Sequence, residues 1–131
     1  MYYRRYDDWI LISALPHFWT AYRSLHVDIV YSSILTTTTF ASLLWHESHE
    51  ASLTLLLIDY VMTLLLVIYE VAMAVDPLWV LQLNMSVFIV NKMMDGLCRY
   101  DILKYDIGHG LFHLVSALKV YYVAETCLLK P

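Results

Sequence analysis

Apolar residues follow one another in long runs along this chain, and few charged residues interrupt them. A helix needs about 20 predominantly apolar residues to cross the hydrocarbon core of a bilayer. The second run ends at Asp76-Pro77, where proline cannot continue a helix and restrains the residue before it. The pattern predicts an all-α integral membrane protein, a helical bundle with about four transmembrane helices. The four runs extend over residues 27–45, 53–75, 78–94 and 107–123.

A shorter apolar segment precedes these runs. Residues 9–20 are apolar but contain Pro16, and a pair of arginines lies before them among tyrosines. Short segments with basic and aromatic flanks lie at the membrane interface more readily than they span it. We therefore expect residues 1–26 to form an N-terminal interfacial segment with one short helix, and residues 27–131 to form the transmembrane helical bundle.

The composition favours a membrane protein over a soluble one. Of the 131 residues, 60% are apolar and only 15% are charged, whereas a soluble domain of this size exposes more charge. The net charge of −4 argues against nucleic-acid binding, which needs a basic face. We expect the lipid bilayer and other membrane subunits as partners, and no nucleic acid.

Ionisable side chains inside the apolar runs are the main exceptions to this pattern. An Asp at the centre of a transmembrane helix costs about 2.5–3.5 kcal/mol, so such residues usually belong to a functional site. His46 ends the first run, Asp59 lies about two turns into the second, and His109 and His113 begin the fourth. With four spans, all four groups belong to one leaflet. His109 and His113 also share a helical face, because they are four residues apart.

Three histidines and a carboxylate at these positions suggest a metal site, and zinc suits them. Catalytic zinc sites commonly use three protein ligands and a water, whose pKa the ion lowers toward about 7. His46, His109 and His113 would be the ligands. Asp59 would hold or deprotonate the water, and Ser42 would donate a hydrogen bond to a substrate oxygen or a ligand. The structural alternative is a histidine pair that hydrogen-bonds between helices.

The same residues resemble a known superfamily. Ser42-x-x-x-His46, then Asp59-Tyr60, then Tyr105-Asp106-Ile107 leading to His109-x-x-x-His113 is similar to the pattern of alkaline ceramidases, adiponectin and progestin receptors and hemolysin III proteins. That superfamily has a Ser, an Asp and three His in a seven-helix membrane bundle, and its hydrolase members bind zinc and cleave lipid amides. The resemblance implies a reduced relative of about four helices. In it the three histidines would be ligands, Asp59 the water partner and Ser42 the accessory polar group.

Two other classes of protein also fit the sequence. The first is a haem- or quinone-binding membrane anchor of the respiratory type, in which His46 or His49 would face His109 or His113 as axial haem ligands. The second is a non-catalytic accessory subunit of a large membrane complex, packed against its partners. Both alternatives would suit the mitochondrial inner membrane.

A second pair of ionisable residues lies inside the runs, away from the histidines. Glu70 falls late in the second run and Lys119 falls late in the fourth. Each would be costly alone in hydrocarbon. We therefore expect an ion pair between the two helices.

Overall fold

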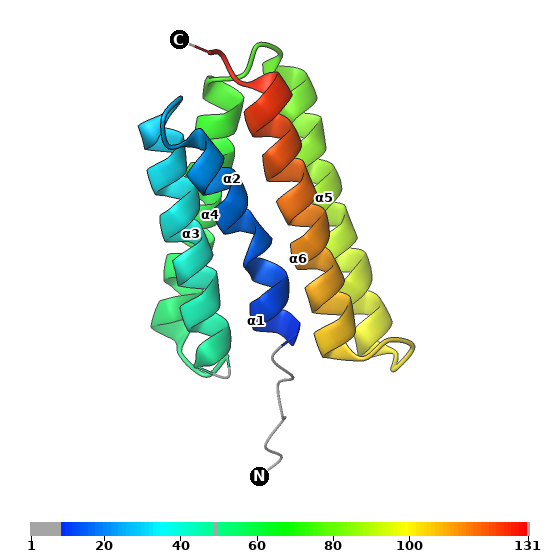
Figure 1. Ribbon diagram of the computed structural model, residues 1–131. Helices are drawn as coiled ribbons and strands as arrows, with labels where there is room; N and C mark the ends of the chain where they lie inside the picture. The colour runs from blue at the N-terminus through cyan, green and yellow to red at the C-terminus, as the bar shows by residue number, and fades with distance from the viewer. Residues whose placement is uncertain (1–8, 49, 131) are drawn as a thin grey trace.

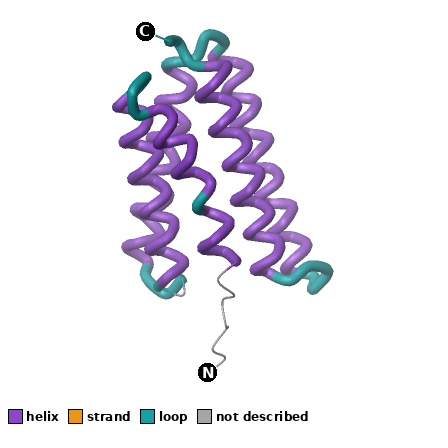
Figure 2. The backbone as a smooth tube through the Cα atoms, in the orientation of Figure 1, coloured by secondary structure: helices purple, strands orange, loops and turns teal. Residues whose placement is uncertain are grey.

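The helices of the computed structural model lie side by side in one bundle (Figure 1), and the structure describes residues 9–48 and 50–130. Short connections join the helices (Figure 2), and the described residues form no strand. The all-α class predicted from the sequence is confirmed. The elements are α1 (Trp9–Ala14), α2 (Pro16–Ser24), α3 (Ile29–Glu47), α4 (Leu53–Ala72), α5 (Pro77–Arg99), α6 (Tyr105–Tyr122) and a terminal π-helical turn, η1 (Val123–Cys127).

The four long helices, α3 to α6, coincide with the four apolar runs, and local capping explains where three of them begin. Asp28 caps α3, Ser52 caps α4 and Asp76 caps α5. Each side chain accepts a hydrogen bond from the backbone N–H three residues later, at 2.9, 3.3 and 3.0 Å respectively. Pro77 is the first residue of α5. A backbone N–H at this position would have no partner within the helix, so proline, which lacks one, costs no hydrogen bond there. The break expected at Asp76-Pro77 is therefore present.

The N-terminal helices α1 and α2 run along the bundle between α3 and α6 (Figure 1). We expected one short interfacial helix beside the bundle. The structure instead shows two short helices that meet at Leu15 and Pro16 and contact both α3 and α6. Residues 1–8 of the expected interfacial segment lie outside the described residues. Small side chains allow the close approach of the two helices to their neighbours, and these are buried: Ser13, Ala14, Thr20, Ala21 and Ser24.

Among the described helices, α4 is the one that is long and apolar enough to cross a membrane. Its side chains lie mostly outside the core, and the two buried ones are Leu66 and Glu70. The other three expected spans form helices, but they are more polar. Threonines at positions 36–39 lie in α3, amide side chains lie in α5, and histidines with Lys119 lie in α6. The expectation of about four transmembrane helices is met by length and composition for α4 alone.

A buried ion pair joins α4 to α6 in the half of the bundle where α6 ends. Lys119 Nζ lies 2.7 Å from Oε2 of Glu70, whose side chain is 0% exposed. Tyr31 on α3 donates a hydrogen bond to Oε1 of the same carboxylate at 2.9 Å, and Asn84 on α5 donates to Oε2 at 3.0 Å. The Glu70–Lys119 pair predicted from the sequence is confirmed. One carboxylate thereby connects all four long helices.

Candidate metal centre

Three imidazole rings meet where the end of α3 faces the beginning of α6. His46 lies in the last turn of α3, and His109 and His113 lie one turn apart on α6. One ring nitrogen from each residue lies within 4.8 Å of the other two. The ring centroids are 4.7 Å apart for His46 and His109, 5.1 Å for His46 and His113, and 4.7 Å for His109 and His113. The structure thus brings together the three histidines that the sequence singles out.

The spacing of these nitrogens suits one tetrahedral ion. Two nitrogens bound to zinc at about 2.0–2.1 Å with tetrahedral angles lie about 3.3 Å apart. The Nε2 atoms of His46 and His109 are 3.1 Å apart. His46 is 4% exposed and His113 is 5% exposed, so protein atoms surround most of the cluster. Three histidine nitrogens with a fourth position left for water are a usual donor set for catalytic zinc.

A carboxylate contacts His46 and determines which of its ring nitrogens carries the proton. Oε1 of Glu50 lies 3.0 Å from His46 Nδ1 and accepts a hydrogen bond from the Tyr105 hydroxyl at 2.6 Å. Burial opposes the ionisation of Glu50, but the hydrogen bonds from His46 and Tyr105 hold the pKa of its carboxyl below the ordinary value. A carboxylate only accepts, so His46 carries its proton on Nδ1 and turns the lone pair of Nε2 toward His109.

His109 has unused hydrogen-bonding capacity. Its Nε2 faces His46, whereas its Nδ1 is buried and has no hydrogen-bond partner among the described residues. A buried polar atom without a partner costs about 1–3 kcal/mol, and such atoms are uncommon in folded proteins. The cluster is therefore not fully satisfied by the protein's own groups, as a purely structural histidine pair would be.

Asp59 lies on α4 and Ser42 lies on α3. Asp59 on α4 is half-buried and is not one of the three described residues whose ligand atoms converge. It is close enough to His46 for their charges to interact. Ser42 is half-buried on α3, one turn before His46. His49, which we considered as a haem ligand, lies outside the described residues.

Two contacts around the cluster were missed in the sequence. One is Glu50 with Tyr105, described above. The other is His17 on α2, whose Nε2 lies 3.1 Å from Ser116 Oγ on α6 and whose Nδ1 lies 2.9 Å from the Ala14 carbonyl oxygen. The sequence held a signal only for the contact of Glu50 with His46, because Glu50 follows His46 by four residues, the spacing of neighbours on a helix.

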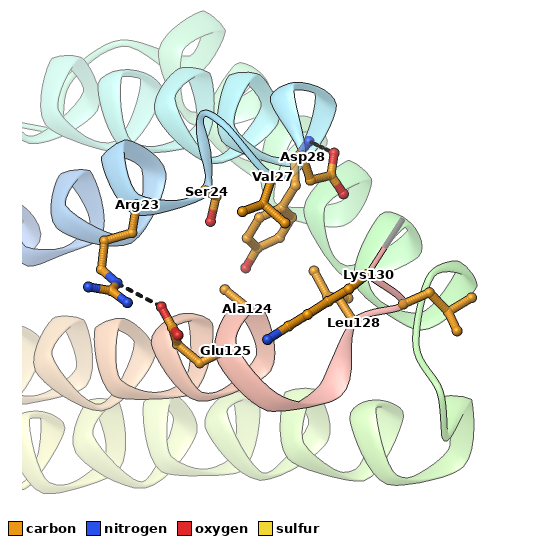
Figure 3. A pocket seen from close by; sticks show the side chains of 10 residues that line it. Arg23, Ser24, Val27, Asp28, Ala124, Glu125, Leu128 and Lys130 are labelled. Atoms are coloured by element: carbon orange, nitrogen blue, oxygen red, sulfur yellow. Dashed lines mark hydrogen bonds and ion pairs between the residues drawn. The ribbon is translucent and has the colours of Figure 1, made fainter.

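A cavity of about 130 Å³ lies at the opposite end of the bundle, and Figure 3 shows its lining. Arg23 and Glu125 form an ion pair at its rim, with 2.7 Å between Nε and Oε1. Asp28, also in the lining, and His46 are separated by the length of α3, about 27 Å at 1.5 Å per residue. The cavity is therefore separate from the histidine cluster.

Comparison of the chain with protein-family models, curated proteins and solved structures gives no match. The resemblance to the ceramidase and adiponectin-receptor superfamily therefore rests on the residues quoted for it.

Proposed function

We propose that the protein is a membrane-embedded zinc hydrolase that cleaves amides carrying long apolar chains. The observation that carries the proposal is the convergence of one nitrogen each from His46, His109 and His113 within 4.8 Å. The resemblance of the surrounding motif to membrane amide hydrolases supports the reaction and the substrate class.

The outer surface of the bundle supports a membrane location. Large apolar side chains on α4 and α5 are about half exposed or more, and they form extended apolar faces. In water such faces favour association or aggregation, whereas a bilayer covers them. We propose that α3 to α6 all span the bilayer and place the histidines in one leaflet. The side chains concerned are Leu53, Leu57, Val61, Leu64 and Ile68 on α4, and Leu78, Met85, Phe88, Ile89 and Met93 on α5.

The residues around the histidines have separate roles in this proposal. His46, His109 and His113 hold the ion, which supplies Lewis acidity and lowers the pKa of a water. Asp59 would accept the proton of that water, since its charge interacts with that of His46 and it lies outside the ligand set. Ser42 donates a hydrogen bond to the oxygen of the substrate amide.

The ring spacing favours a metal ion over haem. Two imidazoles bound to opposite faces of a haem iron lie farther apart than these rings, because the porphyrin plane separates them. The ring centroids of His46 and His109 are 4.7 Å apart. A second candidate function is a non-catalytic accessory subunit, which the exposed apolar faces of α4 and α5 favour, since partner helices could cover them in place of lipid.

The test is the metal content and activity of the full chain purified in detergent. We expect about one zinc per chain in the wild type, none in His113→Ala, and unchanged zinc in His26→Ala, which replaces an exposed histidine outside the cluster. Asp59→Asn should keep the zinc and lose hydrolysis of a ceramide-type amide, because the ligands remain and the proton acceptor is gone.

Three outcomes of this experiment would overturn the proposal or part of it. Equal zinc content in the wild type and His113→Ala would show that the ligand assignment is wrong. A wild type that binds no zinc would favour the accessory subunit. A haem absorption band in the visible spectrum would favour the respiratory anchor instead.

A further inference from the structure

The loop between α3 and α4 has an unusual backbone at Glu50. Its φ is +57°, in the left-handed region that residues other than glycine seldom adopt. The backbone N–H of Glu50 donates a hydrogen bond to the carbonyl oxygen of Trp45 at 3.2 Å, which ties the loop to the last turn of α3. Backbone strain of this kind often occurs at functional sites, where the surrounding structure maintains it.

The side chain of Glu50 contacts both the end of α3 and the beginning of α6. Its Oε1 atom lies 3.0 Å from His46 Nδ1 and 2.6 Å from the Tyr105 hydroxyl. Tyr105 is the first residue of α6, and its ring stacks on that of His109 with 5.2 Å between the centroids. One carboxylate oxygen therefore connects the end of α3 to the beginning of α6, and it contacts the histidine cluster from outside.

We propose that Glu50 and Tyr105 form a positioning pair that holds His46 with its proton on Nδ1, so that Nε2 is free to bind the metal ion. This inference rests on the proposed zinc site and adds two residues to it that are not ligands. Histidines that bind metals usually donate their second ring N–H to a carboxylate or carbonyl group, which fixes the ring and raises its basicity. Glu50 supplies this carboxylate to His46, and Tyr105 fixes the carboxylate through the same oxygen.

The first test is the zinc affinity of the full chain in detergent, measured by competition with a chelator. We expect Glu50→Ala to weaken zinc binding about 10–100-fold, the usual effect of losing such a partner. Tyr105→Phe should weaken it by a smaller factor, because the carboxylate stays but loses its second contact. Glu47→Gln is the matched control, since Glu47 is exposed three residues earlier in the chain, and it should bind zinc as the wild type does.

A second variant separates positioning from a purely structural role. Glu50→Gly removes the carboxylate and suits the left-handed backbone better than glutamate does. We expect the thermal midpoint of the metal-free protein to stay equal or rise while zinc affinity falls about 10–100-fold. If Glu50 only shaped the loop, Glu50→Gly would keep the zinc affinity of the wild type, and the positioning role would be wrong.

A third measurement does not depend on zinc. In the metal-free protein labelled with ¹⁵N-histidine, NMR should show His46 as the Nδ1–H tautomer in the wild type and as a mixture of tautomers in Glu50→Gly. If the wild type binds zinc but the His46 tautomer is the same in Glu50→Gly, the positioning role of Glu50 and Tyr105 is wrong and the zinc site is not affected. A wild type that binds no zinc would instead overturn the proposed function, and with it any role of this pair in binding.

Discussion

Two polar clusters lie at opposite ends of this bundle, and they differ in how completely the protein satisfies them. At one end, both oxygens of Glu70 have partners, from Lys119, Tyr31 and Asn84. At the other end, three imidazoles face one another, and Nδ1 of His109 has no partner among the described residues. A fully paired network stabilises a packing arrangement. The unpartnered Nδ1 shows that the described groups of the protein do not fully satisfy the histidine cluster.

The charges around the two clusters show the same difference. Lys119 neutralises Glu70 within the bundle, so the network needs no further ion. The three histidines instead have two carboxylates beside them, Glu50 in contact with His46 and Asp59 on the neighbouring helix. Two carboxylates would balance a divalent cation held by neutral imidazoles. The histidine end is therefore suited to a cation and the Glu70 end is not.

The largest expected effect comes from breaking the paired cluster. Glu70→Leu leaves the ammonium group of Lys119 buried without its carboxylate, since the Lys119 side chain is only 7% exposed. Removing one partner of a buried ion pair costs about 3–5 kcal/mol. We expect the free energy of unfolding in detergent to fall by about that amount, measured by chemical denaturation.

The double variant Glu70→Leu with Lys119→Met is the control for this loss. It removes both charges and should recover most of the stability, because apolar replacement of a whole buried pair is often neutral. A single variant that loses less than about 1 kcal/mol would show that the network contributes no more than an exposed pair does.

The second expected effect is the stabilisation of the folded protein by zinc bound at the histidine cluster. A ligand that binds only the folded state at 100 times its Kd stabilises it by about 2.7 kcal/mol. We expect added zinc to raise the thermal midpoint of the wild type and of Glu70→Leu, but not that of His113→Ala. Zinc that stabilises His113→Ala as strongly as the wild type would mean that the ion binds elsewhere.

The paired cluster and the long helices were predictable from the sequence, because their causes are local or general. Asp28, Ser52 and Asp76-Pro77 mark the helix starts within a few residues. A lone charge in hydrocarbon is costly wherever it lies, so Glu70 needed a partner such as Lys119. The histidines followed from topology, since antiparallel helices return to the same end of the bundle after each pair of crossings.

Other features depended on contacts that no local pattern specifies. Residues 9–24 carry an apolar stripe that suits a lipid surface and a helix groove equally well, so their packing against α3 and α6 was not predicted. The partner of Glu50 is Tyr105, 55 residues away, so no local spacing predicts the contact. Apolarity alone predicted four spans, and among the described helices α4 is the one that is long and apolar enough to cross a membrane.

A third effect tests whether α1 packs closely against α6 beside the histidine cluster. Gly110 follows His109 on α6, and a Cβ atom there would overlap the indole ring of Trp9 on α1. Gly110→Ala should therefore lower the free energy of unfolding by about 1–3 kcal/mol, the usual result of overpacking. Gly96→Ala is the matched control, because nothing lies within 4 Å of its Cβ position, and alanine in a helix should add about 0.5–1 kcal/mol. Equal effects of the two substitutions would show that α1 does not pack closely here.

The smallest effect concerns the exposed ion pair at the Glu70 end, between Arg23 and Glu125 (Figure 3). The hydrogen bond from Arg23 lowers the pKa of Glu125 below its ordinary value of 4.5. A lowered folded-state pKa gives stability that is complete above the unfolded-state value and is lost as the pH falls through the folded-state value. The side chains are 44% and 33% exposed, so solvent and salt screen the pair.

We therefore expect Arg23→Gln to lower the thermal midpoint slightly at neutral pH and low salt, and to match the wild type in acid well below pH 4.5, where Glu125 is protonated in both. High salt should remove the difference at neutral pH, because it shortens the screening length to about 3 Å at 1 M. The Glu70 effect should persist at high salt, since that pair is buried away from mobile ions. A salt dependence shared by both pairs would mean that water reaches Glu70, and the contrast between a fully paired cluster and an incompletely paired one would no longer hold.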